Sequence, residues 1–194
     1  MKLAAIFGLF CLAAAAFAQD RADPAIAITD IQGKEQHPFQ PSRKASVIVF
    51  ITNDCPISNR YAREIRRICE QFSSSAACYL SYVDPDLTPQ QAAKHMVDYG
   101  HGSYSAIIDR NHTLVKAAGA TVTPEVVVIS AGGKIEYRGR IDNKYVTWGT
   151  ARREATEFDL RAAIQAVAEG RPVATANTKA VGCFITPLDI LKKQ

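Results

Sequence analysis

Short apolar runs alternate along this chain with segments whose apolar residues are spaced as on a helix. Residues 47–51 are apolar and mostly β-branched, which is typical of a strand buried on both faces. The apolar positions that follow are three or four residues apart, namely Ile57, Tyr61, Ile65, Ile68 and Phe72. The pattern therefore predicts a buried strand that gives way to a helix near residue 55.

The rest of the chain continues this alternation. Strands are predicted at residues 25–29, 78–83, 105–108, 125–130 and 135–139. Helices are predicted at residues 88–99, 111–118 and 154–168, the first opened by a capping box from Thr88 to Gln91. Alternating strands and helices require parallel crossovers, whereas the turn at Gly132-Gly133 adds an antiparallel hairpin. The fold class is therefore α/β, with a central mixed sheet flanked by helices.

The two ends of the chain differ from this central part. Residues 1–18 combine Lys2, an apolar run and a small-x-small ending, which predicts a cleaved secretory signal peptide and a periplasmic or secreted protein. This run is too short for a membrane anchor, so stable membrane insertion is not expected. Residues 19–45 are interpreted as an extension with a short strand, residues 46–170 as one domain, and residues 171–194 as a tail.

Charge excludes one class of partner. The formal net charge of +4 falls to +3 without Lys2, and the basic residues form no block, so nucleic acid is not an expected partner. Four arginines do crowd the helix after residue 55: Arg60, Arg63, Arg66 and Arg67. They fit either a solvated helix face or a docking patch for an acidic partner, and they add positive potential nearby.

Four cysteines remain after cleavage, and their placement suggests two roles. Cys69 and Cys78 lie near the end of a helix and the start of a strand, close enough to form a disulfide in an oxidising compartment. Cys55 lies at a helix start, with Asp54 as the predicted N-cap, where the helix dipole stabilises a thiolate. This position predicts sulfur redox chemistry, and the alternative is a buried structural cysteine. Cys183 lies in the tail.

Several motifs resemble a known group of proteins. Thr123-Pro124 precedes a late strand, and a glycine hairpin follows that strand. The chain resembles the thioredoxin-like redoxin superfamily, which includes peroxiredoxins. It is most similar to exported bacterial redoxin-domain proteins with a Cys-Pro-Ile-x-Asn-Arg-Tyr motif, here residues 55–61. Further matches lie at residues 123–125, 137–142 and 182–185.

The resemblance implies a fold and also exposes departures. It implies a thioredoxin-like three-layer sandwich in which Pro124 is cis and lies against the nucleophilic cysteine. Ser58 stands where a thioredoxin has its second cysteine, so a local dithiol is absent. Thr52 matches the threonine of a peroxiredoxin motif, whereas Ile48 stands where that motif has proline.

The same resemblance implies roles for residues far along the chain. A peroxidatic cysteine is oxidised to a sulfenic acid that a second thiol condenses with, and Cys183 is the candidate for this resolving thiol. Arg138 or Arg140 would lower the pKa of Cys55 and hold peroxide. Asp142 would orient one of these arginines through a charge-assisted pair.

Two other readings stay open. Copper-delivery proteins on this fold suggest a metal site made by Cys55 with His95 or His101, since thiolate and imidazole both bind copper. However, Ile51 stands where such proteins have a further cysteine. A non-catalytic redoxin-fold interaction module is the second alternative. Trp148 lies in a loop that either covers the site or packs on the core.

The preferred hypothesis is an exported thiol redox protein. Its nucleophile is Cys55, which attacks a peroxide or a protein disulfide, and Cys183 resolves the product. An external thiol reductant or a client protein is the expected partner, and no cofactor is required. The candidate site residues are Cys55, Cys183, Thr52, Pro124 and Arg140.

Overall fold

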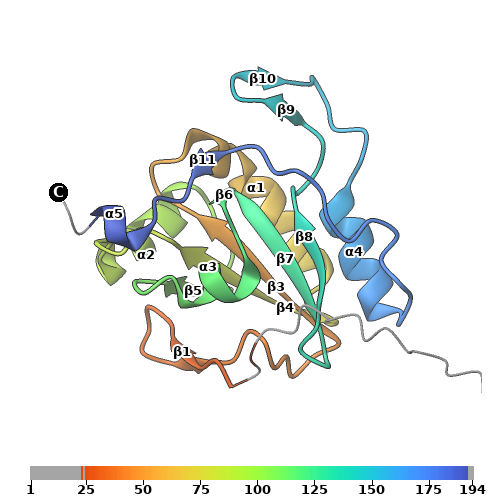
Figure 1. Ribbon diagram of the computed structural model, residues 1–194, viewed down its shortest axis with the longest axis horizontal. Coiled ribbons are helices and arrows are strands. Elements are labelled where there is room, and N and C mark those ends of the chain that lie inside the picture. Colours follow the sequence, from red (N-terminus) through yellow and green to blue (C-terminus); the bar gives the residue numbers. More distant parts are fainter. Residues whose placement is uncertain (1–22, 24, 192–194) are drawn as a thin grey trace, which may run out of the picture.

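A five-stranded mixed sheet runs through the protein, whose computed structural model describes residue 23 and residues 25–191 (Figure 1). The strands lie in the order β5-β4-β3-β7-β8. They are β5 (Ser105–Ile108), β4 (Ala76–Tyr82), β3 (Ala45–Ile51), β7 (Glu125–Ser130) and β8 (Ile135–Gly139). The first three are parallel to one another, and β7 is antiparallel to both β3 and β8. The predicted mixed sheet is confirmed.

Helices cover both faces of this sheet. The core on one face packs against α1 (Pro56–Gln71) and α4 (Asp159–Ala168), and the core on the other face against α3 (Thr113–Ala118). Strand β3 is buried along its whole length, and its residues other than Ser46 are apolar because alternate side chains enter different cores. Val47, Val49 and Ile51 face the first core, and Ile48 and Phe50 face the second. This arrangement confirms the three-layer sandwich.

Side-chain hydrogen bonds determine where two of the helices begin. Helix α2 (Pro89–Asp98) opens with the predicted capping box of Thr88 and Gln91. Helix α3 begins at Thr113 rather than at residue 111, since the Asp109 carboxylate accepts hydrogen bonds from backbone N–H groups of the first turn. The predicted start of α4 at residue 154 is wrong, because the residues before Asp159 form a loop.

Hydrogen bonds from one asparagine keep this loop from continuing the helix. The Asn143 side-chain oxygen accepts hydrogen bonds from the backbone N–H groups of Thr156 and Glu157, and its amide donates to the Thr156 hydroxyl. These bonds offer the backbone an alternative to a helical turn. The helix therefore begins at Asp159.

The N-terminal part forms a small hairpin of β1 (Ile28–Thr29) and β2 (Glu35–Gln36). The strand predicted at residues 25–29 is thus present but shorter. The predicted signal peptide lies outside the described residues. Within the described residues, no helix is both long enough and apolar enough to cross a membrane.

Two short pairings beyond the main sheet were not predicted. Strands β9 (Tyr145–Thr147) and β10 (Thr150–Ala151) form a hairpin that projects from the body of the molecule (Figure 1). The tail crosses the molecule after α4, and its strand β11 (Cys183–Phe184) pairs antiparallel with β6 (Val122–Thr123) before a last short helix, α5 (Leu188–Leu191).

The predicted disulfide between Cys69 and Cys78 is formed, with its sulfurs 2.13 Å apart. It joins the last turn of α1 to β4. This helix carries Cys55 at its other end, so the bond anchors the element on which the candidate nucleophile is placed.

Candidate functional site: two thiols from opposite ends of the domain

Cys55 is itself the N-cap of α1. The prediction that Asp54 caps this helix is wrong, because Pro56 is the first helical residue and Cys55 has the extended backbone of a cap. An N-cap side chain normally accepts a hydrogen bond from the backbone N–H two or three residues later. The Cys55 thiol makes no such cap hydrogen bond in this structure, and the Ser58 backbone is the first-turn group that lowers its pKa.

A second thiol lies directly on the first. The Cys183 thiol donates a hydrogen bond to the Cys55 sulfur across 2.7 Å, and the Cys55 thiol donates to the Thr123 carbonyl across 3.1 Å. Cys55 is 1% exposed, whereas Cys183 is only half-buried. The two residues are 128 positions apart, and β11 supplies the second sulfur. Neither sulfur takes part in a disulfide in this structure.

The backbone around Thr123 holds the tail in place. The Thr123–Pro124 peptide bond is cis, as the resemblance implied, and the Thr123 carbonyl lies between Cys55 and the tail. Gly182 approaches this carbonyl so closely that a Cβ there would lie 1.9 Å from the oxygen. Only glycine allows this approach. The candidate residues Cys55, Cys183 and Pro124 are thus brought together.

The two thiols differ in acidity. Burial raises the pKa of Cys55, but hydrogen bonds from the thiol of Cys183 and from the side chain and backbone of Ser58 outweigh it, so this pKa lies below its ordinary value. Burial, together with the hydrogen bond to Cys55 and the charges of Cys55 and Asp54, raises the pKa of Cys183 to about 12. Cys55 is therefore the thiol that ionises first, and Cys183 retains its proton and donates it to the thiolate.

Ser58 is a site residue to which the sequence analysis gave no role. Its side chain is 1% exposed, and its hydroxyl has no hydrogen-bond partner among the described residues when Cys55 is a thiol. Once Cys55 ionises, this hydroxyl has an acceptor. The available signal was its position three residues after Cys55, which in the capping box is the position that faces the N-cap side chain.

Thr52 and Arg140 lie differently from what the resemblance implied. Thr52 precedes the cap, with its carbonyl 3.4 Å from the Cys55 backbone nitrogen, and its buried hydroxyl has no partner among the described residues. The Arg140 guanidinium binds the carboxylates of Asp159, at 2.7 Å, and Glu157. Arg140 therefore anchors the start of α4, and within residues 25–191 its guanidinium makes no hydrogen bond to Cys55.

The other residues of that motif are also engaged elsewhere. Arg138 donates to the carbonyls of Ala118 and Gly119. Asp142 accepts from the Tyr61 hydroxyl and from the backbone of Lys144, so it orients a tyrosine and a turn rather than an arginine.

His95 supports the loop before Cys55 through Asn59. Its two ring nitrogens lie 2.8 Å from the Tyr82 hydroxyl and 2.9 Å from the Asn59 side-chain oxygen. The Asn59 amide in turn donates to the carbonyl of Asn53, in the loop that leads to Cys55. Since both nitrogens are engaged and burial lowers the pKa of His95, this side chain is a neutral support of the loop.

The copper alternative gains no ligand set from this geometry. His101 bonds the Tyr104 hydroxyl at 2.8 Å, and no group of three His, Cys, Asp or Glu side chains in residues 25–191 has a metal-binding arrangement. Burial, with a smaller contribution from His95, lowers the pKa of His101 to about 4.

Comparisons with known proteins identify the architecture. No protein-family model matches the chain, and no curated protein matches it in sequence. Among solved structures, a hypothetical protein from Sinorhizobium meliloti 1021 is 24% identical, with a TM-score of 0.71 over 86% of this chain and 92% of that one. An uncharacterized conserved protein from Geobacillus kaustophilus is 23% identical, with a TM-score of 0.70 over 86% and 92%.

A third structure carries a descriptive name. It is a secreted Mycobacterium tuberculosis disulfide oxidoreductase homologous to E. coli DsbE, 12% identical, with a TM-score of 0.52 over 75% of this chain and 95% of that one. The fold is thioredoxin-like. At these identities the comparisons establish the fold, and the chemistry has to be argued from the thiol pair.

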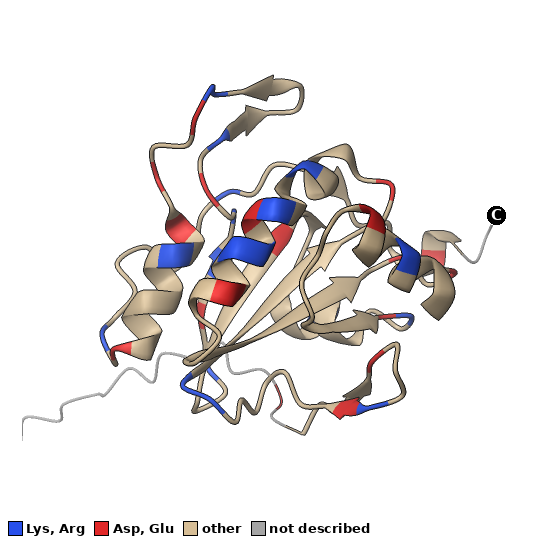
Figure 2. Ribbon diagram, turned by 180° about the vertical axis from the view of Figure 1, so that it is seen from behind, with Lys and Arg blue, Asp and Glu red and all other residues tan. Residues whose placement is uncertain are grey.

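On this thioredoxin-like fold, α1 carries basic and acidic residues along its length (Figure 2). Arg60, Arg63 and Arg67 are exposed, and Arg67 pairs with Glu64 on the same helix. The groups that lower the pKa of Cys55 are instead the neighbouring thiol and Ser58. These arginines are therefore best described as a solvated helix face.

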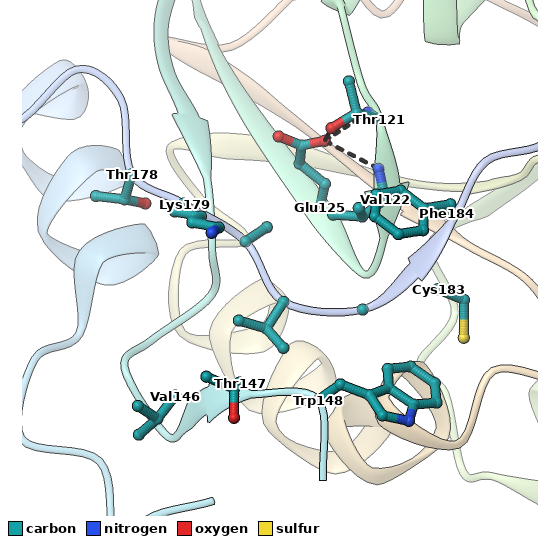
Figure 3. A pocket seen from close by; sticks show the side chains of 13 residues that line it. Thr121, Val122, Glu125, Val146, Thr147, Trp148, Thr178, Lys179, Cys183 and Phe184 are labelled. Atoms are coloured by element: carbon teal, nitrogen blue, oxygen red, sulfur yellow. Dashed lines mark hydrogen bonds between the residues drawn. The ribbon is translucent and has the colours of Figure 1, made fainter. Parts of the chain in front are cut away.

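A hollow opens beside the outer thiol of this thioredoxin-like fold (Figure 3). Its volume is about 640 Å³, and its walls come from the tail, from β6 and from the β9–β10 hairpin. Trp148, 63% exposed at the turn of that hairpin, and Phe184, 87% exposed beside Cys183, both line it. Trp148 thus neither packs into the core nor covers Cys55.

Proposed function

We propose that this protein is a thiol oxidoreductase that cycles between a Cys55–Cys183 dithiol and the corresponding disulfide. The observation that carries the proposal is the 2.7 Å approach of two free sulfurs from residues 128 positions apart. Structural thiols have no need of such contact, whereas a nucleophile and its resolving thiol do.

The roles follow from acidity. A thiolate is the nucleophile in sulfur chemistry, and the pKa of Cys55 is lowered while that of Cys183 is raised. Cys55 therefore attacks first. The retained proton of Cys183 stabilises the thiolate, and Cys183 becomes the second nucleophile after Cys55 has reacted.

With a protein disulfide as substrate, two exchanges complete the half-cycle. The Cys55 thiolate attacks one sulfur of the substrate, forming a mixed disulfide and releasing one substrate thiolate. Cys183, after losing its proton to solvent, attacks the Cys55 sulfur and releases the second substrate thiolate. The substrate gains two electrons and becomes a dithiol, and the pair Cys55–Cys183 is left as a disulfide.

Peroxide is the second candidate substrate, favoured by the 1% exposure of Cys55, because a small oxidant reaches a buried thiolate more easily than a protein does. The thiolate attacks one peroxide oxygen and the O–O bond breaks, so the sulfur becomes a sulfenic acid. The other oxygen leaves as hydroxide and takes a proton from solvent to become water. Cys183 then condenses with the sulfenic acid, and water leaves. Thr52 lies next to this segment, with its backbone carbonyl 3.4 Å from the Cys55 backbone nitrogen.

Export is part of the proposal. The predicted signal peptide and the Cys69–Cys78 disulfide both fit an oxidising compartment, where an external thiol reductant would have to regenerate the dithiol.

The test uses the reduced mature protein, treated separately with oxidised glutathione and with hydrogen peroxide. We expect mass spectrometry to find a Cys55–Cys183 disulfide in both cases, and the faster reaction identifies the substrate class. Cys183→Ser should stop at a mixed disulfide or a sulfenic acid on Cys55, whereas Cys55→Ser should not react. If wild-type Cys55 reacts no faster than free cysteine with either oxidant, the protein is a non-catalytic module.

A further inference from the structure

We propose that the hollow beside Cys183 receives a cysteine-bearing polypeptide segment with apolar side chains, and that its thiolate reduces the protein by attacking Cys183 rather than Cys55. The proposal rests on the proposed function, because it describes how the Cys55–Cys183 disulfide is reopened. It assigns a docking site and a point of attack to a partner that the dithiol cycle requires.

The two sulfurs differ in how accessible they are to a partner. Cys55 is buried beneath the tail, next to the Thr123 carbonyl and α1. Cys183 is only half-buried, and its side chain lines the hollow (Figure 3). An incoming thiolate on this side of the molecule therefore meets Cys183 first.

The chemistry favours the same sulfur. In thiol–disulfide exchange, the thiol of lower pKa is the better leaving group. Attack on Cys183 expels Cys55 as a thiolate that hydrogen bonds from the side chain and backbone of Ser58 still stabilise, whereas attack on Cys55 would expel Cys183, whose pKa burial raises. Access and leaving-group stability thus agree.

The walls of the hollow indicate what the partner carries beside its cysteine. Apolar side chains dominate them, and the largest is the indole of Trp148 on the β9–β10 hairpin (Figure 3). Aromatic side chains at the centre of a contact contribute much of the binding energy between proteins. Phe184, next to the reactive sulfur, is almost fully exposed and gains most from being covered.

Charge in the hollow also suits an anionic attacker. The Glu125 carboxylate is bonded to the backbone N–H groups of Thr121 and Val122, which offset its charge (Figure 3). Lys179, exposed on the tail, lines the same hollow and is its cationic side chain. A thiolate or an acidic neighbour on the partner is therefore attracted to this wall.

The reduction balances as two exchanges. The partner thiolate attacks the Cys183 sulfur, the Cys55–Cys183 bond breaks, and its electron pair leaves on Cys55. A second thiolate of the partner then attacks the partner sulfur of this mixed disulfide, and Cys183 leaves and takes a proton from solvent. The partner, a dithiol protein, becomes a disulfide, and the protein returns to its dithiol form.

The test uses two short peptides with one cysteine each, flanked by leucine in one and by serine in the other, together with glutathione. Each is added to the oxidised protein, and the products are trapped by alkylation and mapped by mass spectrometry. We expect the peptide on Cys183 and the alkyl group on Cys55. The leucine peptide should react about tenfold faster than the serine peptide or glutathione, a difference of the size expected when one buried anchor is lost.

Trp148→Ala should remove most of this preference for the leucine peptide. Val97→Ala is the matched control, because Val97 is an exposed apolar residue on α2, away from the hollow. A mixed disulfide on Cys55, or equal rates for the three thiols, overturns the inference. If the Cys55–Cys183 disulfide never forms, the proposed function itself fails, and the two failures are thus distinguished.

Discussion

Gly182 is the residue on which the contact between the two thiols depends most directly. In Gly182→Ala the new Cβ would lie 1.9 Å from the Thr123 carbonyl oxygen and 2.5 Å from its carbon. Ordinary contact begins near 3.4 Å, so the tail has to move away by about 1.5 Å, the difference of the two distances. The obstacle is backbone on both sides and cannot rotate aside.

The displacement acts on the next residue. Cys183 carries the sulfur that now lies 2.7 Å from Cys55, and reacting groups lose roughly a hundredfold in rate for a misplacement of about 1 Å. We therefore expect Gly182→Ala to close the Cys55–Cys183 disulfide roughly a hundredfold more slowly than the wild type. The main sheet and helices α1 to α4 should fold as in the wild type, since Gly182 lies outside all of them.

Two measurements check this expectation. The first is the rate of disulfide closure after an oxidant is added to the reduced protein, followed by quenching and mass spectrometry. The second is the rate at which N-ethylmaleimide alkylates Cys55, which should rise because the displaced tail uncovers a sulfur that is now buried. Gly132→Ala is the control, because a Cβ there has no heavy atom within 4 Å. Wild-type closure in Gly182→Ala would refute the reasoning.

Three further predictions concern acidity and stability. Ser58→Ala should raise the pKa of Cys55, so at pH values below the ordinary 9.0 the variant should be alkylated more slowly than the wild type. An unchanged pH profile of alkylation would rule out the Ser58 hydroxyl as a donor to Cys55. His101 is kept neutral when folded, with its pKa at about 4 against 6.5 unfolded, so the free energy of unfolding should fall by up to about 3 kcal/mol as pH drops through this window. Urea titrations should show a flatter profile for His101→Gln, and equal profiles would contradict the assignment. Replacing both Cys69 and Cys78 by serine should cost roughly 2.5 kcal/mol in urea unfolding, the loop entropy for a separation of nine residues, and no loss would contradict it.

The main sheet could be read from the sequence because its signals are local. The bounds of β5, β7 and β8 agree with the prediction, since each is a run of β-branched or alternating residues between turn residues. The start of α4 could not be read in this way. Its apolar spacing continues back to residue 154, but the competing hydrogen bonds come from Asn143, on a loop eleven or more positions earlier.

The candidate site likewise has a part that local sequence signals predict and a part that depends on contacts between distant residues. Cys55 was found because a strand, a proline and a helical stripe surround it within one short segment. The proximity of Cys183 was suggested only by the resemblance, since β11 has two residues and pairs with a strand sixty positions earlier. The implied role of Arg140 depended on the direction of a long side chain, and the nearby carboxylates of Asp159 and Glu157 determine that direction.

The division of the site between two distant segments has a physical consequence for the chemistry. The Cys183 thiol on the tail and Ser58 at the helix start together lower the pKa of Cys55. The tail supplies the second sulfur, and its place depends on the close approach of Gly182 to Thr123 and on the β6–β11 pairing. In a local dithiol, both sulfurs are fixed by one helix. In the proposed cycle the nucleophile is fixed by the helix and the resolving thiol by a surface strand, so a displacement of the tail should slow the second step and also raise the pKa of Cys55.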